Sequence, residues 1–389
     1  MPGFCHPRDT AGCRRGDKDN PRMDHLPHDE ALMRQALALA EQASYITSPN
    51  PRVGCVIASA NGSILGQGHT QAVGQAHAEV MALEDAKAKG HDVAGATVYV
   101  TLEPCSHQGR TGPCCEALQQ AGVARVVMSV QDPNPQVAGQ GLARLQAAGI
   151  QVSTGMYEEQ AREINIGFFK RMQQGSPWLR LKIAQSLDGQ TALPNGQSQW
   201  ITGQAARDDG HHWRARACAV LSGIGTVLQD DPLLNVRAVT TPRQPDVLLI
   251  DSRLQTPLNA RLWQVHRRVV IFHAVRDPVK EAALQAKGAT LVALCGPGDK
   301  VDLPAMVKQL AALNYNEVHI EAGHKLNGSL LQAGLVDELL VYLSPSLMGP
   351  GQPMAALPTL TQMDQVQRWR FHQTTAIGHD LRLVLRPVR

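Results

Sequence analysis

Hydrophobic and polar residues in the first half of the chain follow a helical period in some segments and a strand period in others. In residues 28–43 the apolar side chains recur every three or four positions behind two acidic residues, which predicts a helix. Asn61 and Gly62 separate two apolar runs, as in a two-residue hairpin turn. Further helices are predicted over 76–90, 113–122, 138–149 and 157–172, and strands over 53–59, 63–69, 96–102, 124–130 and 150–155. This order predicts a mixed sheet packed between two layers of helices.

The pattern is interrupted after residue 172, where a predicted helix is followed by Gly175, Ser176 and Pro177. A chain of 389 residues is too long for one ordinary core, so we place a domain boundary there. Strands are then predicted over 179–189, 217–226, 245–251, 267–273, 289–295, 316–323 and 336–345, and helices over 203–217, 277–288, 304–314 and 324–334. The sequence thus predicts a disordered tail at 1–23, one α/β domain at 24–172 and a second α/β domain at 178–389.

Composition argues against several classes of protein. Hydrophobic residues make up 43% of the chain, as in globular proteins, and the longest apolar runs are far shorter than the ~20 residues of a membrane-spanning helix. The formal net charge is +3, and no segment gathers Lys and Arg among aromatic residues, so we expect neither a membrane nor a nucleic acid as partner. Eight cysteines are too few for a disulfide scaffold, and residues 1–22 lack the apolar core of a secretion signal. We therefore expect a cytoplasmic protein whose cysteines are metal ligands or core residues.

Residues with metal-site chemistry stand at the starts of predicted helices. His77 and Glu79 open the helix that follows the hairpin. Cys105 comes shortly after the next strand, and Cys114 opens the helix after it. A hydrolytic zinc site needs three protein ligands and one open position for water, and a histidine nitrogen with two thiolates supplies the three. Zinc lowers the pKa of bound water from about 15.7 towards about 7, and Glu79 is placed to take that proton and pass it to a leaving amine.

Each of these residues also has a plainer interpretation. A histidine at a helix start is often a surface cap, and Cys114 and Cys115 could be small core residues, as we expect for the cysteines in apolar strand segments. What favours the metal site is the combination of His-x-Glu, a strand, Pro-Cys and a further cysteine at the next helix. This is the signature of zinc nucleobase deaminases, with a wider cysteine spacing. Of the two neighbouring thiols, Cys114 directly after Pro113 is the better candidate ligand.

Four segments of the first domain resemble the deaminase domain of a known family. They read NPRVGCVI, HAEVMAL, VTLEPCSHQGRTGPCCEAL and SVQDPNPQVAGQG, and they are similar to the bifunctional riboflavin-biosynthesis deaminase/reductase family. The resemblance implies a cytidine-deaminase-like α/β/α sandwich with a mixed sheet. It also implies that the insert between the two thiols helps hold a ribose phosphate, to which His107 and Arg110 could present positive charge. Asn50 would contact the pyrimidine, although a turn residue is an equal interpretation from the sequence alone.

The second domain resembles the reductase domain of the same family, so the resemblance covers almost everything from residue 24 onward. The matching segments are LRLKIAQSLDGQTA, SQWITG, GTVLQDDPLLNVR and EAGHKLNGSLLQAGLVDEL. The family implies a dihydrofolate-reductase-like α/β fold, and the residues alone say less. SGIGT lacks the full dinucleotide fingerprint, whereas EAGHKLNGSL offers the N–H groups of a helix start to a pyrophosphate. An ordinary strand-to-helix turn would look similar.

Two sets of residues in the second domain carry over from the family. Substrate binding is implied for Ser198, Arg214, Leu234, Arg237 and Glu321, and the planar guanidinium groups of the arginines suit a phosphate. NADPH binding is implied for Gln185, Trp200, Thr226, Asp230, Ser252, Gly323, His324, Lys325, Leu326, Asn327, Gly328 and Ser329. The family usually has alanine or another small residue where Gln185 stands. Lys182 and Asp230 are the ionisable residues we expect nearest the hydride transfer, where either could assist by proton transfer.

The resemblance implies an enzyme with two fused activities and small pyrimidine ribose-phosphate substrates. Zinc-dependent deamination of 2,5-diamino-6-ribosylamino-4(3H)-pyrimidinone 5′-phosphate would precede NADPH-dependent reduction of its ribosyl group to ribityl. We also expect a homo-oligomer, either a dimer or a tetramer. One rival is another zinc deaminase, acting on cytidine or an RNA base, and the long insert between Cys105 and Cys114 argues against it. A non-catalytic binding module is a second rival, against which Glu79 argues because a pure binder needs no base. The sequence leaves open a chain in which only one half works.

Overall fold

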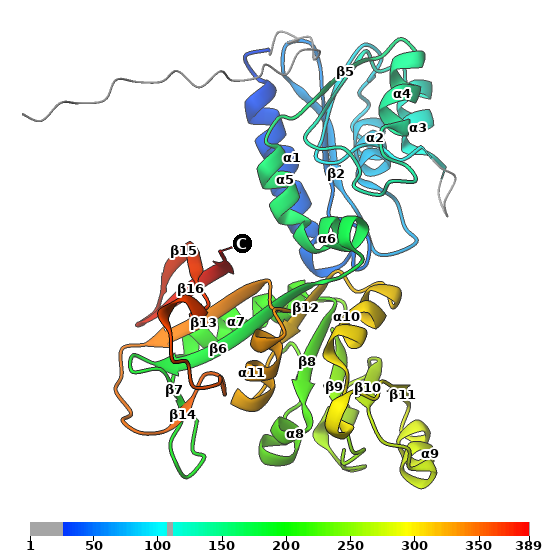
Figure 1. Ribbon diagram of the computed structural model, residues 1–389. Helices are drawn as coiled ribbons and strands as arrows, with labels where there is room; N and C mark the ends of the chain where they lie inside the picture. The colour runs from blue at the N-terminus through cyan, green and yellow to red at the C-terminus, as the bar shows by residue number, and fades with distance from the viewer. Residues whose placement is uncertain (1–25, 107–111, 389) are drawn as a thin grey trace, which may run out of the picture.

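The computed structural model describes residues 26–106 and 112–388, and these form two lobes (Figure 1). The first lobe, at the top of Figure 1, contains the elements from α1 to α6, and the second contains those from β6 to β16. α6 ends at Gln174 and β6 begins at Trp178, so residues 175–177 connect the lobes. The predicted tail at 1–23 lies outside the described residues, as do His107 and Arg110.

The described part of the first lobe contains a five-stranded sheet with the order β2-β1-β3-β4-β5. β1 is antiparallel to β2 and β3, whereas β3, β4 and β5 are parallel to one another. α1 and α5 lie on one face of the sheet, and α2, α3 and α4 lie on the other (Figure 1). This is the mixed sheet between helical layers that the sequence predicts. The elements are α1 (Asp29–Gln42), β1 (Gly54–Ala58), β2 (Ile64–His69), α2 (Ala78–Ala88), β3 (Thr97–Val100), α3 (Cys114–Gln120), β4 (Arg125–Met128), α4 (Gln140–Ala147), β5 (Gln151–Thr154), α5 (Glu158–Ile164) and α6 (Ile166–Gln174).

The single helix predicted over 157–172 is in fact two helices, α5 and α6. They are separated at Asn165, whose φ of −113° and ψ of 23° are not helical. The Asn165 side chain accepts a hydrogen bond from the Arg52 N–H (2.8 Å) and donates one to the Arg52 carbonyl (2.8 Å). A side-chain amide that pairs with backbone groups competes with the helix around it. The periodicity of the sequence does not reveal such a distant partner.

Residues 178–387 are described throughout, and nine of their strands form one sheet in the order β11-β10-β9-β8-β12-β6-β13-β16-β15. Neighbours from β11 to β13 are parallel, whereas β16 is antiparallel to both β13 and β15. The strands of this sheet are β6 (Trp178–Ser186), β8 (Ala219–Gly223), β9 (Asp246–Ile250), β10 (Val269–His273), β11 (Ala289–Ala293), β12 (Glu317–Ile320), β13 (Glu338–Ser344), β15 (Trp369–Ile377) and β16 (Asp380–Pro387). β7 (Gln190–Ala192) and β14 (Gln352–Pro353) pair separately.

The helices of the second lobe confirm four predicted segments and add one. They are α7 (Gln204–Arg216), α8 (Ile224–Asp230), α9 (Pro278–Ala286), α10 (Leu303–Ala312) and α11 (His324–Gln332). The strand predicted over 217–226 is too long, because β8 ends at Gly223 and α8 follows at once. The sequence pattern also misses β15 and β16. β15 is an edge strand with mostly exposed side chains, so it lacks the apolar alternation by which a half-buried strand is recognised.

The lobes meet through charged side chains that are shielded from solvent. Arg52, in the loop before β1, is 6% exposed, and its Nη1 lies 2.6 Å from Glu317 Oε1 in the second lobe. The same guanidinium donates to the carbonyls of Ile164 (2.7 Å) and Arg216 (3.0 Å). Burial alone would raise the pKa of Glu317, but Arg216, Arg52 and Arg180 together lower it well below its ordinary value. Glu317 is therefore a fixed negative charge at the junction.

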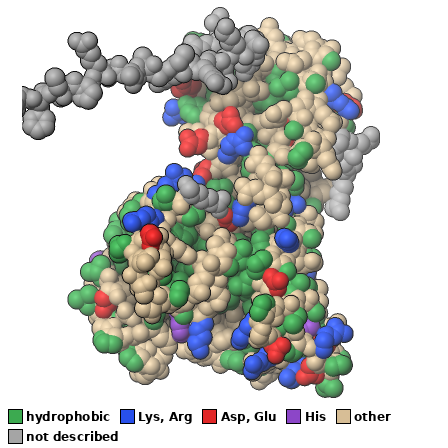
Figure 2. All heavy atoms as spheres, in the orientation of Figure 1, with side chains coloured by type: hydrophobic (Ala, Val, Ile, Leu, Met, Phe, Trp, Pro, Cys, Tyr) green, Lys and Arg blue, Asp and Glu red, His purple; other side chains and the backbone are tan. Residues whose placement is uncertain are grey.

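The surface is mixed in charge on the face that Figure 2 shows. Lys and Arg side chains lie interspersed with Asp and Glu there, so this face carries no broad region of a single sign. Within residues 26–106 and 112–388, none of the helices is both long enough and apolar enough to cross a membrane.

Candidate active sites

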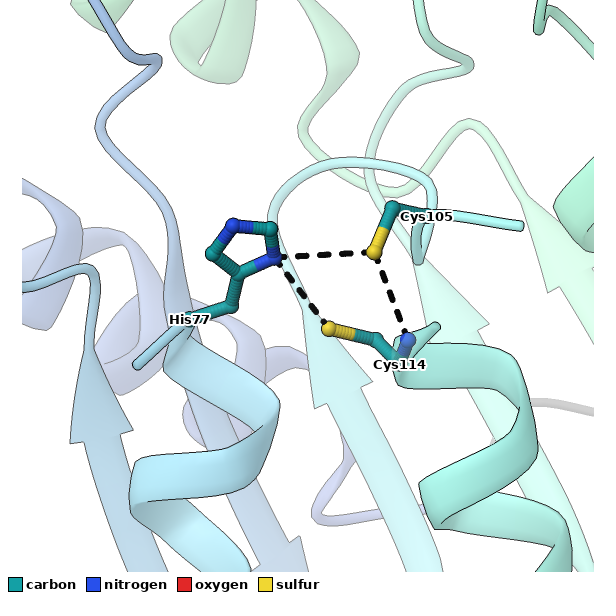
Figure 3. Close-up of side chains that lie close together, drawn as sticks. All are labelled: His77, Cys105 and Cys114. Atoms are coloured by element: carbon teal, nitrogen blue, oxygen red, sulfur yellow. Dashed lines mark hydrogen bonds between the residues drawn. The ribbon is translucent and has the colours of Figure 1, made fainter. Parts of the chain in front are cut away.

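Three possible metal ligands meet in the first lobe (Figure 3). His77 stands directly before the first residue of α2, Cys105 lies in the segment after β3, and Cys114 is the first residue of α3. His77 Nδ1 lies 3.5 Å from Cys105 Sγ and 3.4 Å from Cys114 Sγ. One ligand atom from each residue lies within 4.8 Å of the other two. The fold thus brings together the three ligands that the sequence predicts.

The spacing of these ligand atoms fits a tetrahedral zinc ion. With a Zn–N distance of about 2.1 Å and a Zn–S distance of about 2.3 Å, tetrahedral angles place the nitrogen and sulfur about 3.6 Å apart. The two observed N···S distances, 3.5 and 3.4 Å, agree with this separation. Structural zinc sites use four protein ligands, whereas catalytic sites use three and keep one position open for water. Within the described residues the group contains three ligands, as a hydrolytic site requires.

Hydrogen bonds at this site favour the thiolate form of Cys105. Hydrogen bonding from the Cys114 thiol, and then from His77 and the Cys114 backbone N–H, lowers the pKa of the Cys105 thiol despite its burial. The backbone N–H of Cys114, at the start of α3, lies 3.3 Å from Cys105 Sγ. Hydrogen bonding to Cys105 raises the pKa of His77 and of the Cys114 thiol, so these two groups must still lose a proton to bind a metal. Because thiols must lose their protons to bind a metal, this environment prepares Cys105 for that role.

Glu79 is a buried acid beside the three ligands. It stands in the first turn of α2, two residues after His77, and is 4% exposed. Burial raises the pKa of its carboxyl to about 7, and the charge of Cys105 adds to the rise. A carboxyl with a pKa near neutrality can accept and donate a proton at neutral pH. The residue predicted as the base therefore lies beside the three candidate ligands, and its part in proton transfer stays a prediction.

Cys115, the neighbour of Cys114, belongs to the core of the first lobe. Its Sγ donates to the carbonyl of Pro104 (3.2 Å), and burial raises the pKa of its thiol to about 12. Cys114 faces His77 instead, because successive residues of a helix point in different directions. The preference for Cys114 as the metal-facing thiol therefore agrees with the geometry.

Glu103 is a positioning residue that the sequence analysis misses. It is 6% exposed, and its carboxylate accepts hydrogen bonds from four backbone N–H groups, those of Asp132, Gly139, Gly141 and Leu142, at 2.9–3.1 Å. These bonds tie the segment before Cys105 to the start of α4. A Glu-Pro-Cys order after a buried strand is the only signal of this role in the sequence, and it does not identify the partners.

Asn50, the residue expected to contact a pyrimidine, lies half-buried in the loop before β1. Its backbone N–H donates to the Thr47 carbonyl (2.7 Å), as a turn residue would. The backbone hydrogen bond of Asn50 agrees with the interpretation as a turn residue. A contact between the Asn50 side chain and a pyrimidine stays a prediction.

A large cavity opens in the second lobe beyond the carboxyl ends of β8, β9 and β12, where ligands bind in open α/β sheets. Its volume is about 1520 Å³. Pockets for one drug-sized ligand measure roughly 300–1,000 Å³, so this cavity has room for a cofactor and a second ligand. The predicted residues that line it are Lys182, Ser198, Trp200, Arg214, Thr226, Asp230, Leu234, Arg237, Ser252, Glu321, Gly323, His324, Lys325, Leu326, Asn327 and Ser329.

Two predicted cofactor residues, Gln185 and Gly328, are not part of the cavity wall. Gly328 lies against the chain near Ala356, where an added Cβ would come within 2.2 Å of the Ala356 carbonyl oxygen. Its lack of a side chain therefore permits close packing of α11, and a cofactor contact stays a prediction, as it does for Gln185. Lys300 and Tyr342 do line the cavity, but no motif in the sequence pointed to either of them.

Charged side chains in the cavity wall are arranged around an ion pair. Arg214 and Glu321 pair through two hydrogen bonds, one of them between Nη2 and Oε2 at 2.7 Å. Arg237 is exposed, and its nearest partner is the Asn235 side chain at 3.4 Å. Burial lowers the pKa of Lys182, which also interacts with the charges of Glu321 and Arg214. Arg237 therefore keeps donors that an anionic ligand can use.

The folds and sites together define a zinc-binding deaminase domain followed by a reductase domain. Residues 26–130 match the family described as the cytidine and deoxycytidylate deaminase zinc-binding region, and residues 177–383 match the RibD C-terminal domain. The chain belongs to the RibD family and is a bifunctional deaminase and reductase of riboflavin biosynthesis. This membership confirms the predicted cytidine-deaminase-like and dihydrofolate-reductase-like α/β folds and the two predicted activities.

Similar proteins match the chain along nearly its whole length. The riboflavin biosynthesis protein RibD of Escherichia coli (strain K12) is 44% identical over 366 residues, which are 92% of this chain and 99% of that protein. The Acinetobacter baumannii RibD structure is 40% identical, with a TM-score of 0.84, and covers 94% of this chain and 100% of its own. A Thermotoga maritima structure is described as a diaminohydroxyphosphoribosylaminopyrimidine deaminase/5-amino-6-(5-phosphoribosylamino)uracil reductase. It is 29% identical, with a TM-score of 0.81, over 92% of this chain and 99% of its own.

Proposed function

We propose that the two lobes act in turn on one pyrimidine sugar phosphate. The first lobe hydrolyses 2,5-diamino-6-ribosylamino-4(3H)-pyrimidinone 5′-phosphate, so that a ring C–NH₂ becomes a carbonyl and ammonia leaves. The second lobe reduces the ribosyl group with NADPH and gives 5-amino-6-(5-phospho-ribitylamino)uracil. One observation carries this proposal: the same chain contains three candidate zinc ligands in its first lobe and a cavity of about 1520 Å³ in its second lobe.

For the deamination, His77, Cys105 and Cys114 would hold one Zn²⁺ ion per chain, which lowers the pKa of water at its open position. Glu79 accepts the proton of the attacking water and delivers it to the departing nitrogen. Its burial keeps bulk water from competing for that proton. One water is consumed and one ammonia is released in each turnover.

For the reduction, the cavity wall offers separate positions to the cofactor and the substrate. The turn at Gly323 and the start of α11 present backbone N–H groups that suit the pyrophosphate of NADPH. Ser252 and Arg253, after β9, are placed to meet the 2′-phosphate that distinguishes NADPH from NADH. Arg237, with its free donors, suits the phosphate of the substrate.

The reduction needs a proton as well as a hydride. NADPH supplies the hydride to the ribose carbon that carries the pyrimidine amine, and the C–O bond of the ring breaks there. The ring oxygen then takes up a proton and becomes a hydroxyl group. Lys182 and Asp230 both line the cavity, and burial lowers the pKa of Lys182 and raises that of Asp230, which brings each nearer neutrality. Both residues are therefore candidates for the proton donor.

We also propose that the chain works in the cytoplasm as a homo-oligomer. The six cysteines within the described residues are all free, as is usual in a reducing compartment. The homo-oligomer is supported by β15, which is an edge strand. Its Phe371 side chain is 68% exposed, and an exposed edge strand with an apolar side chain suits a contact with a second copy of the chain. Light scattering on the purified chain distinguishes a monomer from a dimer or a tetramer.

Two assays on the purified, zinc-loaded chain test the main proposal. One follows ammonia release from the diaminopyrimidine substrate, and the other follows NADPH oxidation with the already deaminated intermediate. Glu79→Gln should lower ammonia release by about 10²- to 10⁴-fold, the usual contribution of general acid–base catalysis. It should leave NADPH oxidation with the deaminated intermediate unchanged.

Glu84→Gln is the matched control, because Glu84 stands on the same helix, more than one turn beyond Glu79. It should behave as the wild type in both assays. Normal ammonia release by Glu79→Gln would remove Glu79 from the mechanism. A wild-type chain that showed neither activity would refute the proposed substrates.

A further inference from the structure

His211 is a nearly buried histidine in the wall of the reductase cavity. It lies on α7, three residues before Arg214, and is 5% exposed. Its Nδ1 is shielded from solvent and has no hydrogen-bond partner within the described residues, yet the residue contributes to the cavity wall. Because Nδ1 is enclosed, we infer that Nε2 is the ring nitrogen within reach of a ligand in the cavity. A buried histidine with no partner of its own is suited to a ligand that supplies one.

The proton of the neutral ring is assigned to Nε2. A neutral imidazole carries one N–H and one lone pair, and a buried N–H without an acceptor is rarer in proteins than an under-used acceptor. We therefore place the lone pair on the shielded Nδ1 and the N–H on Nε2, an assignment from the surroundings. His211 then presents a hydrogen-bond donor to the cavity.

Burial, with help from two neighbouring arginines, favours the neutral form of the His211 ring. Burial lowers the pKa of His211 to about 4, and the positive charges of Arg214 and Arg237 contribute to this. The negative charges of Glu321 and Asp208 act in the opposite direction and are outweighed. Since Glu321 is already paired with Arg214, Asp208 is the other negative charge that favours a protonated ring, and it does not outweigh burial and the two arginines.

His212, the next residue, shows that the placement of His211 is specific. Its side chain is exposed, and its Nδ1 lies 2.7 Å from the Tyr45 hydroxyl of the first lobe. Two neighbouring histidines of one helix therefore point to different surroundings. His212 is a natural control for any substitution of His211.

We propose that Nε2 of His211 binds the 5′-phosphate of the sugar-phosphate substrate, together with Arg237. A neutral donor in a cavity wall that also holds the free donors of Arg237 suits an anion, and this substrate carries one strongly anionic group. The phosphates of NADPH have other positions available, at the start of α11 and at Ser252. This inference rests on the proposed function, because it assigns a further contact to the same substrate.

The proposal is tested with two substrates, the deaminated intermediate and the same compound without its phosphate. Reductase kcat/KM is measured for wild type, His211→Ala, His211→Gln and His212→Ala. Loss of a hydrogen bond to a charged group predicts about a 10- to 100-fold rise in KM for the phosphorylated substrate in His211→Ala. The value for the unphosphorylated substrate, and KM for NADPH, should change little. His211→Gln keeps an N–H donor and should recover part of the loss, while His212→Ala should match the wild type.

A second readout uses the wild-type chain and inorganic phosphate as the probe. Histidine-labelled protein is titrated by NMR, with the His211 signal assigned from its loss in His211→Gln. Phosphate near Nε2 stabilises the charged ring, so it should raise the pKa of His211 from about 4 towards the ordinary value. At a pH between the pKa of His211 in the free protein and its pKa in the phosphate complex, phosphate binding should be accompanied by uptake of one proton. Phosphate should therefore bind more tightly to wild type than to His211→Gln. This difference in affinity should grow as the pH falls.

The outcomes separate this inference from the proposed function. A wild-type chain that reduces neither substrate with NADPH overturns the proposed function itself. If wild type is active, an equal loss on both substrates in His211→Ala overturns the phosphate contact, and so does a His211 pKa that phosphate leaves unchanged. A loss confined to the phosphorylated substrate establishes it.

Discussion

The metal site of the first lobe and the cavity of the second differ in how they are assembled. The metal site takes its three candidate ligands from a stretch of fewer than 40 residues, at the starts of two helices and in the segment that follows β3. The cavity takes its wall from segments spread between Lys182 and Gln352. The reaction at the metal site depends on the identity of a few residues. Ligand binding in the wide cavity depends on many residues from remote parts of the fold. Loss of one ligand should therefore abolish one activity, and loss of one cavity residue should only weaken the other.

Cys105→Ala should have the largest effect, and it tests the first half of this comparison. Two ligands no longer complete a catalytic zinc site, so ammonia release should fall by at least about 10³-fold, because both water activation and proton transfer depend on the metal. Zinc content measured by elemental analysis should fall with it, and NADPH oxidation with the deaminated intermediate should persist. Cys295→Ala is the control, since Cys295 is exposed. Full zinc content in Cys105→Ala would mean that the site is held differently.

Arg52→Ala tests whether the two lobes are as independent as their sites. Leaving a buried charge without a partner costs about 3–5 kcal/mol, and because Glu317 keeps Arg180 and Arg216 the loss here should be smaller than that. We expect a lower midpoint of unfolding and, at temperatures where the protein stays folded, two working activities. Lys89→Ala is the matched control, because the Lys89–Asp85 pair has a similar length, 2.6 Å, but is exposed and should contribute only about 0–1 kcal/mol. Equal destabilisation by both variants would contradict the importance of burial at the junction.

Glu321→Gln should have the smallest effect and tests the second half of the comparison. It removes one charged partner of Arg214 while keeping the shape of the side chain. Loss of a charged hydrogen bond predicts roughly a 10- to 100-fold lower reductase kcat/KM, with normal zinc content and ammonia release. Glu30→Gln, at an exposed ion pair of α1, is the control. A complete loss of reductase activity would show that the cavity depends on single residues as strongly as the metal site does.

Periodicity predicted most of the helices and strands, and its failures have identifiable causes. It joined α5 and α6 because the contact between Asn165 and the backbone of Arg52 spans 113 residues. It missed β15 because an exposed edge strand lacks alternation. Local patterns record which face of an element is buried, and they carry no information on a partner far along the chain.

The candidate sites also contain residues that local sequence patterns identify and residues whose role depends on distant partners. The ligands of the metal site and Glu79 could be chosen from the sequence because zinc accepts few residue types and because helix starts favour thiolates. Glu103 could not be chosen, since its four hydrogen-bond partners lie between Asp132 and Leu142. His211 resembled His212 in the sequence, and only burial distinguishes the two.

The sequence by itself predicted the chemistry of this protein: which atoms can bind a metal, which acid can move a proton and, through the family resemblance, which arginines can meet a phosphate. The tertiary structure decided where those groups stand and how acidic they are. It turned Cys114 towards His77 and Cys115 towards the core, and it buried Glu79 until the pKa of its carboxyl rose to about 7. The reason is physical. A side chain carries its functional group wherever it goes, but its pKa and partners depend on solvent exclusion and on neighbours that folding alone supplies.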